Sequence, residues 1–308
     1  MNKSIFFCAL LLTACAATEA PLSDIEIVDT DVFPESITSM DDGTVIAGSV
    51  KGIVYRAEPG TGQAIPWIHH SPENGILTIL GVLADEGNNT LWLCSVPNFF
   101  GPERSEGTSS LMAFDLDTGE QKGIYYFPAP GGACNDITIG PDGTAYATDT
   151  PNGRILALRP GSDELTLFGQ DPSLAGIDGI AFSEDWTLYA NNVQTNQIFR
   201  VEINDNGSME ALVSLTLSEE LGGPDGMRLI EGNRFIQAES SIGRLGILSI
   251  EGDNASLEVL DDTVQSSPGA TMVGNTAYVI ESNIQYLINP DLQGQEIPPF
   301  MLLAVPLH

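Results

Sequence analysis

The stretch NDITIGPDGTAYATDTPNGRILAL, residues 135–158, decides the fold. It contains three short runs of β-forming residues, divided by Asp-Gly at 142–143 and by Asn-Gly at 152–153. Such dipeptides between apolar runs are typical of tight hairpin turns. The stretch has no ten-residue helical pattern, so it predicts three antiparallel strands joined by short turns.

The same arrangement repeats along the chain. Residues 178–203 read DGIAFSEDWTLYANNVQTNQIFRVEI, and residues 35–57 read ESITSMDDGTVIAGSVKGIVYRA. Six such rows begin near residues 35, 80, 135, 178, 225 and 269, with steps of about 45, 55, 43, 47 and 44 residues. Several short strands in each of six repeats predict an all-β fold, a six-bladed β-propeller over residues 23–308 without a second domain.

Three details of this propeller follow from the positions of the rows. Residues 24–30 precede the first row, and we expect them to form the outer strand of the last blade, beside residues 300–305, and so to close the ring. The stretch 97–110 predicts an insertion between the second and third strands of its blade. We expect the three tryptophans to pack within or between blades; they are Trp67, Trp92 and Trp186.

The composition excludes several classes of partner. The 308 residues include 42 acidic and 11 basic ones, for a formal net charge of −31. Nucleic acid is excluded, because its binding needs a basic surface, and so is an anionic membrane surface. Because 42% of the residues are hydrophobic, the chain has enough apolar material for a full core. We expect a monomer whose partner is a small molecule.

The first residues predict a targeting segment. An apolar run too short to span a bilayer leads to Leu-Thr-Ala-Cys at 12–15, which is similar to a bacterial lipobox. We therefore expect a signal peptide at 1–14, lipidation of Cys15 and a linker at 15–22. Ala16 follows the cysteine where an Asp would retain the protein at the inner membrane, which favours the periplasmic side of the outer membrane. The alternative is an ordinary signal peptide cleaved near Ala17.

One position of the repeat carries oxygen-bearing side chains in four rows. It lies just before the innermost strand, so all four side chains should meet at one mouth of the central channel. Carboxylate and amide oxygens without His or Cys favour a hard cation such as Ca²⁺, although another divalent ion is possible. The alternative is a purely structural role, in which each residue only accepts hydrogen bonds from local backbone donors in a turn. The predicted metal ligands are Glu35, Asn135, Asp178 and Asp225.

The rows PESI, ACNDITIGPDGTAYATDT, GIDGIAFSEDWTLYANN and GPDGM resemble the gluconolactonase and senescence-marker-protein (regucalcin) family of six-bladed propellers. More distantly they are similar to paraoxonases and strictosidine synthases. The resemblance implies that Glu35, Asn135 and Asp225 hold a divalent ion, usually calcium, which polarises a lactone carbonyl, and that Asp225 or Glu35 acts as the base. Asp178 stands where the family usually has a second asparagine, which adds one negative charge.

The resemblance also bears on specificity. Ala133 stands where sugar-lactone enzymes often have a substrate-binding arginine, so a less polar substrate becomes more plausible. Phe99 and Phe100, in the 97–110 insertion, are candidates for the wall of the substrate pocket, with an ordinary loop as the alternative. The functional expectation is a calcium-dependent hydrolase of a lactone or related ester. Its alternatives are a non-catalytic ligand-binding or assembly propeller with a structural calcium, and a different reaction at the same site.

The histidines and cysteines give weaker signals. His69 and His70 are expected to be loop or packing residues, and His308 is terminal. Cys94 and Cys134 should lie near the predicted metal site in neighbouring blades. Two buried thiols are the favoured interpretation there, and a disulfide is the alternative.

Overall fold

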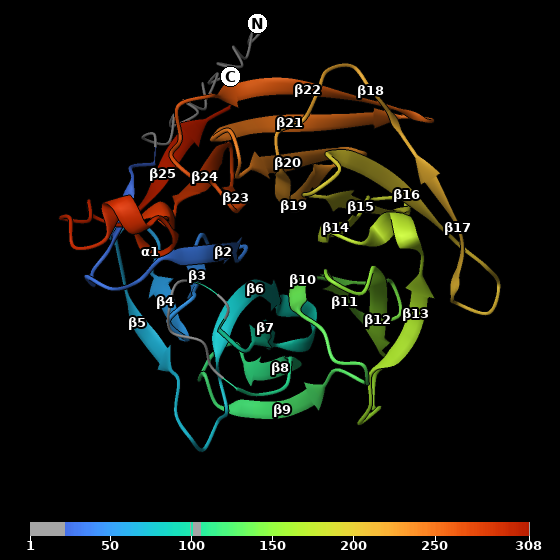
Figure 1. Ribbon diagram of the computed structural model, residues 1–308, viewed down its shortest axis with the longest axis horizontal. Coiled ribbons are helices and arrows are strands. Elements are labelled where there is room, and N and C mark those ends of the chain that lie inside the picture. The colour runs from blue at the N-terminus through green and yellow to red at the C-terminus, as the bar shows by residue number, and fades with distance from the viewer. Residues whose placement is uncertain (1–21, 99, 101–105, 308) are drawn as a thin grey trace, which may run out of the picture.

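The computed structural model describes residues 22–98, 100 and 106–307. Six β-sheet blades stand around a central channel, as Figure 1 shows, so the predicted six-bladed propeller is confirmed. In blades one to three, each given from the innermost strand outward, the strands are β2 (Pro34–Ser39), β3 (Val45–Ser49), β4 (Ile53–Ala57) and β5 (Gln63–His69); β6 (Thr78–Asp85), β7 (Thr90–Val96), β8 (Ser110–Asp115) and β9 (Gln121–Tyr126); β10 (Cys134–Ile139), β11 (Ala145–Asp149), β12 (Arg154–Leu158) and β13 (Thr166–Gln170).

The remaining three blades follow the same plan. Blade five carries the additional short strand β18, which pairs in parallel with β22 at its outer edge. The strands of blade four are β14 (Ile177–Phe182), β15 (Leu188–Asn192), β16 (Gln197–Ile203) and β17 (Met209–Ser214). Those of blade five are β19 (Pro224–Glu231), β20 (Arg234–Glu239), β21 (Arg244–Glu251), β22 (Asn254–Asp261) and β18 (Thr216–Leu217). Those of blade six are β23 (Ala270–Val273), β24 (Thr276–Glu281), β25 (Met301–Pro306) and β1 (Ile25–Ile27).

The ring is closed by the first described strand. β1 pairs antiparallel with β25, with Ile25 opposite Leu302, which confirms the expected partnership of residues 24–30 with residues 300–305. It also pairs in parallel with β5, so that Glu26 lies opposite Gln63. The last blade and the first blade therefore form one continuous sheet across the seam.

The hydrophobic core lies between the blades. Ile46 and Val54 of the first blade meet Ile79, Val82 and Leu93 of the second, and all five are fully buried. Burying such a side chain contributes about 1.5–3 kcal/mol relative to leaving it exposed. The alternation of apolar residues along the strands thus packs neighbouring blades face to face.

The first hairpin turn has the same chemistry in the first and third blades. Gly43 and Gly143 adopt left-handed backbone angles, with φ of 90° and 82°, and an Asp before each accepts a hydrogen bond from the following Thr. Trp186 occupies the same turn position in the fourth blade with φ 66° and is 53% exposed. Its ring still meets the ring of Phe182 of the same blade edge-on, with centroids 6.0 Å apart. The expectation that it packs within or between blades is therefore met by this one contact, while about half of the side chain is exposed.

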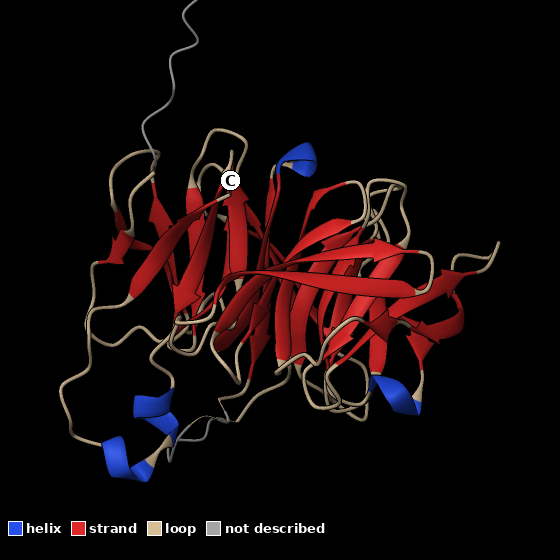
Figure 2. Cartoon of the chain, turned by 90° about the horizontal axis from the view of Figure 1, so that it is seen from above, coloured by secondary structure: helices blue, strands red, loops and turns tan. Residues whose placement is uncertain are grey.

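The helices are short and lie in the connections. They are η1 (Glu86–Asn88), η2 (Pro172–Leu174), α1 (Gln285–Ile288) and η3 (Pro290–Leu292). Figure 2 shows α1 and η3 on the face of the ring that also carries η2, opposite to η1. Within the described residues, none of the helices has the length and apolarity needed to cross a membrane. The proposed signal peptide, linker and lipidated Cys15 lie outside the described residues, except for Leu22.

Candidate metal centre at one mouth of the channel

The four predicted ligands occupy equivalent places in four blades. Each is the second residue of an innermost strand, and these strands are β2, β10, β14 and β19. In each blade the pairing with the second strand breaks at this residue, for example between Cys134 and Ile137 and between Ile177 and Ile180. A bulge of this kind re-aims a side chain out of the regular alternation.

Three of the four side chains are in direct contact. The Asn135 Nδ2 donates to Asp178 Oδ2 at 2.7 Å and to Thr150 Oγ1 at 3.1 Å. The carboxyl groups of Asp178 and Asp225 are hydrogen-bonded to each other, and Asp225 also interacts with Ser240. The structure therefore brings Asn135, Asp178 and Asp225 together.

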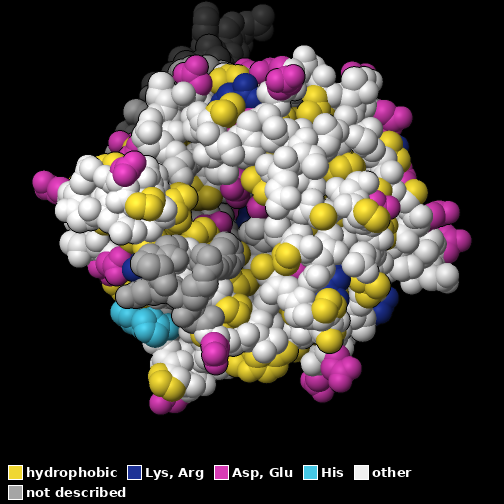
Figure 3. All heavy atoms as spheres, viewed as in Figure 1, with side chains coloured by type: hydrophobic (Ala, Val, Ile, Leu, Met, Phe, Trp, Pro, Cys, Tyr) yellow, Lys and Arg dark blue, Asp and Glu magenta, His cyan; other side chains and the backbone are white. Residues whose placement is uncertain are grey.

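Glu35 faces the same group from the first blade. Its carboxylate interacts electrostatically with Asp225 and with Asp136, and it has no hydrogen bond among the described residues. Figure 3 shows this face of the molecule hollowed at its centre, with acidic side chains visible inside the hollow.

The burial of these carboxyl groups shifts their protonation. Removal from water, reinforced by the charges of Asp225 and Asp136, raises the pKa of Glu35 well above its usual range. Burial, followed by the charges of Asp225, Glu35 and Asp136, likewise raises the pKa of Asp178. Burial raises the pKa of Asp225 to about 7, although its hydrogen bonds to Ser240 and Asp178 oppose the shift. Ionising all three carboxyl groups at once, with no positive charge beside them, is therefore unfavourable.

The donor set fits a hard cation in its chemistry but not in its present arrangement. Within the described parts of the chain, no three or more His, Cys, Asp and Glu side chains are arranged to hold a metal ion. The Asn135 amide presents its NH₂ group to Asp178, and Asp178 shares a hydrogen bond with Asp225. A cation would have to take the place of the contact between Asp178 and Asp225, and the amide would have to turn so that Asn135 Oδ1 faces inward.

Side chains of neighbouring strands hold the backbone of this centre. Thr148 Oγ1 donates to the Asp178 carbonyl at 3.0 Å, and Asn191 Nδ2 donates to the Asp225 carbonyl. Gly179 must remain a glycine for the same packing, since a Cβ there would overlap the Asp225 carbonyl oxygen. The backbone at Asp178 and at Asp225 is thus held by the blade before it.

The loop that precedes each ligand is anchored to the end of a second strand. The buried Asp149 accepts from Ala133 N at 3.1 Å and pairs with Arg154 at 2.6 Å. Asn192 Nδ2 donates to the Ala175 carbonyl at 2.8 Å, and Glu239 plays the corresponding part before Asp225. Partly buried Ala133 itself ends one such loop, beside Asn135.

Cys94 and Cys134 form a disulfide, with Cα atoms 5.0 Å apart. The favoured interpretation of two buried thiols is therefore wrong, and the alternative holds. Cys94 lies on β7 and Cys134 begins β10, so the bond joins the second and third blades directly beside Asn135. The sequence could not decide this point, because the proximity depends on how the two blades meet.

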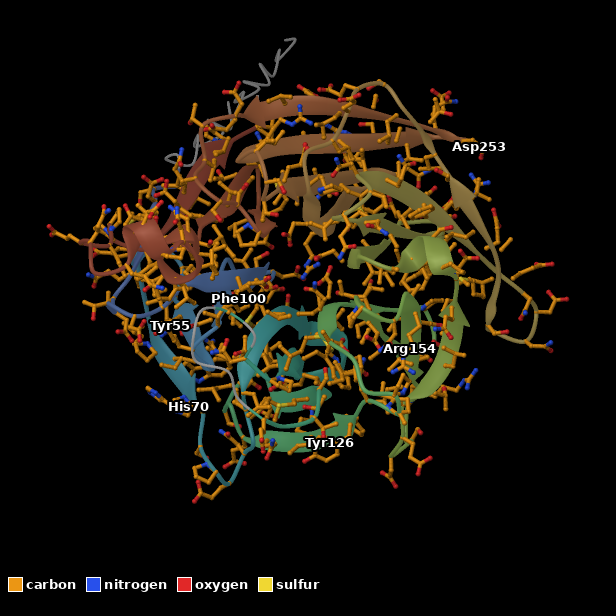
Figure 4. The ribbon with its side chains drawn as sticks, in the orientation of Figure 1. Tyr55, His70, Phe100, Tyr126, Arg154 and Asp253 are labelled. Atoms are coloured by element: carbon orange, nitrogen blue, oxygen red, sulfur yellow. A yellow bond between two sulfur atoms is a disulfide. The ribbon has the colours of Figure 1, made fainter. Side chains whose placement is uncertain are left out.

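Neither the insertion nor the histidines contribute a described side chain to the group of four ligands. Phe99 is outside the described residues. Phe100 is partly buried and lines a cavity of about 260 Å³ with Tyr286 and Leu287, on the face that carries α1. His69 ends the outer strand of the first blade and His70 follows it; both are exposed, and Figure 4 shows His70 at the rim, away from the channel.

Sequence inspection missed two residues of the channel, Asp136 and Arg228. Asp136 is buried beside Asn135, and its charge acts on Glu35, Asp178 and Asp225. Arg228 pairs with Asp136 across the channel. The Asn-Asp pair at 135–136 is the one signal in the sequence that points to Asp136.

The fold and the acidic centre together define a class, that of six-bladed propellers with a polar channel mouth. The strictosidine synthase-like, N-terminal family matches residues 17–57. A gluconolactonase from Xanthomonas campestris is similar in structure, with 16% identity, coverage of 96% of this chain and 93% of that chain, and a TM-score of 0.66. No curated protein matches the sequence.

Two further solved structures share the fold. A luciferin-regenerating enzyme has 12% identity, coverage of 94% of this chain and 96% of that chain, and a TM-score of 0.68. Virginiamycin B lyase from Staphylococcus aureus has 17% identity, coverage of 92% and 98%, and a TM-score of 0.59. At these identities the likeness establishes the propeller fold, which serves several chemistries.

Proposed function

We propose that this protein is a calcium-dependent hydrolase that opens a lactone or related ester at the channel mouth. The observation that carries the proposal is the convergence of buried Asp178 and Asp225 with half-buried Glu35, carboxylates that destabilise one another, and with the amide of Asn135. Such a group is relieved by a divalent cation. The strictosidine synthase-like match and the gluconolactonase fold are compatible with this assignment.

In this proposal Glu35, Asn135, Asp178 and Asp225 hold the cation. When bound, Ca²⁺ supplies a Lewis acid for the substrate carbonyl oxygen. Asp225, or Glu35 in its place, takes the proton from the attacking water.

The substrate would approach across the face that carries the insertion. Ala133, close to Asn135, leaves room there and offers no charge, and Phe100 contributes an apolar wall. A lactone or ester with apolar substituents would suit these surroundings. We further propose that the protein works as a monomer, anchored through lipidated Cys15 at the periplasmic side of the outer membrane.

The test is hydrolysis of a lactone and ester panel by the full chain, in calcium and in chelator. We expect turnover that is lost in chelator and restored by calcium, and a loss of about 10²–10⁴-fold in Asp225→Ala. Asp142→Asn is the matched control, because Asp142 lies in an exposed hairpin turn at the other end of the channel. Calcium binding without turnover on any member of the panel would instead favour the non-catalytic ligand-binding propeller.

A further inference from the structure

Arg228 spans the channel beneath the acidic centre. It lies on β19, three residues after Asp225. Its Nη1 donates to Asp136 Oδ2 at 2.7 Å and to the Met227 carbonyl at 2.9 Å, and its Nη2 donates to the Val82 carbonyl at 3.2 Å. One guanidinium therefore joins the innermost strands of the fifth, third and second blades.

Asp136 is held in place from two sides. Besides Arg228, its Oδ2 accepts the backbone N–H of Ile180 at 3.0 Å, from the innermost strand of the fourth blade. Its side chain is 5% exposed and that of Arg228 is 13% exposed, so the ion pair is largely removed from water. The Asp136 carboxylate is thus directed to Arg228 and Ile180, while Asn135, the residue before it, reaches Asp178.

Stability alone does not explain this pair. A buried ion pair gains little over an apolar pair of the same size, because both charges lose their hydration. Arg228 Nε is moreover buried without a hydrogen-bond partner, which adds a cost. The chain also has two buried pairs that clamp loops, Arg154–Asp149 and Arg244–Glu239, whereas Arg228 contacts innermost strands only.

The ion pair of Arg228 with Asp136 affects the charge balance of the channel mouth. Asp136 raises the pKa of Glu35, Asp178 and Asp225, so its negative charge reaches all three. Without the guanidinium of Arg228 beside it, Asp136 would be a fourth uncompensated carboxylate in a centre whose other three already repel one another. Arg228 offsets that charge and occupies the carboxylate that a cation would otherwise attract.

We infer that Arg228 is a positioning residue for the channel-mouth cation site, which keeps Asp136 out of the cation's coordination and limits the centre to three uncompensated carboxylates. The inference rests on the proposed function, since it concerns the cation that the proposal places there. Two explanations make different predictions. If Arg228 acts through charge, removing it and removing Asp136 have opposite effects on cation affinity. If the pair is only a structural strut, both changes weaken binding together.

The experiment measures Ca²⁺ affinity by isothermal titration calorimetry on the full chain and four variants. Arg228→Met should tighten binding roughly tenfold, because Asp136 is then uncompensated, and Asp136→Asn should weaken it roughly tenfold. The double variant, which restores the formal charge balance, should return near the wild-type dissociation constant. Arg228→Lys, which keeps the charge but not the fork, should also stay near it.

The control is Arg234→Met, which removes an arginine whose ion pair with Glu231 is exposed. It should leave the affinity unchanged. Circular dichroism and thermal unfolding in chelator establish that each variant is folded. If Arg228→Met fails to fold, the comparison of Asp136→Asn with Arg228→Lys still decides, because only the charge explanation separates them.

The outcomes separate this inference from the proposed function. A wild-type chain that binds no divalent cation overturns both. Wild-type binding with single variants that shift in the same direction, or do not shift, overturns the role of Arg228 and leaves the proposed function standing. Opposite shifts with recovery in the double variant support the inference.

Discussion

The pKa of Asp225 leads to a prediction about the metal-free protein. Replacing Asp225 by Asn removes an ionisable group while keeping its shape and its ability to bond with Asp178 and Ser240. Burial raises the pKa of Asp225 from 3.8 to about 7. The folded protein therefore binds this proton more tightly than the unfolded chain. The stability that this group contributes is present in full below pH 3.8 and is lost as the pH rises to about 7.

The magnitude follows from the two pKa values. Their difference corresponds to about 4 kcal/mol at pH 8, where Asp225 is ionised in both states, and to about 2 kcal/mol at pH 5. In chelator, Asp225→Asn should therefore be more stable than the wild type by about 4 kcal/mol at pH 8. For a protein of this size that is roughly 7 °C in melting temperature. The gain should shrink by about half at pH 5.

The assay is urea and thermal unfolding at pH 8 and pH 5, in chelator and again in calcium. Calcium should stabilise the wild type more at pH 8 than at pH 5, because protons and the cation compete for the same oxygens, and should stabilise Asp225→Asn much less. Asp142→Asn in the exposed turn should show neither effect. A metal-free Asp225→Asn protein that is no more stable than the wild type at pH 8 would refute the reasoning.

Two more predictions concern the frame around Asn135. Replacing Cys94 and Cys134 together by Ser should cost about 4 kcal/mol in the chain-entropy account of a cross-link between residues 40 apart, measured by urea unfolding; two free thiols in unfolded, non-reduced wild type would contradict the bond. Asp149→Asn leaves the buried Arg154 without its partner carboxylate and should cost about 3–5 kcal/mol, while the double variant with Arg154→Met should recover part of the loss in the same assay. Equal stability of the single and double variants would count against an ion-pair role.

The blade architecture could be predicted because it depends on local signals that repeat. Five of the six rows place a β-rich run before a turn that contains Asp-Gly or Gly-Asn, and six repetitions leave few alternatives to a closed ring. The seam between residues 24–30 and 300–305 followed from one leftover strand at each end. Trp186 departs from the pattern because a turn that elsewhere uses glycine carries an aromatic residue there, and the backbone angle of the turn then sets its exposure.

The candidate centre could be predicted only in part. Equivalent repeat positions identify residues that face one channel mouth, which led to Asn135, Asp178 and Asp225. The contact of Asp136 with Arg228 has no such signal, because it joins different repeat positions across the channel. The disulfide escaped firm prediction for a related reason: two strand cysteines have the same local sequence character whether or not the blades bring their sulfur atoms together.

The strand that closes the ring also bears on how the protein folds. Ile25 and Leu302 pair although about 280 residues separate them, so their contact forms only after almost the whole chain has been made. The entropy of closing such a loop grows only as the logarithm of its length, and each doubling adds about 0.6 kcal/mol. The four strands of each other blade are consecutive in the sequence, and only blade five adds a further strand, β18, across a crossover. We therefore expect the pairing of β1 with β25 to form last during folding and to open at the lowest free energy, which amide hydrogen exchange would measure.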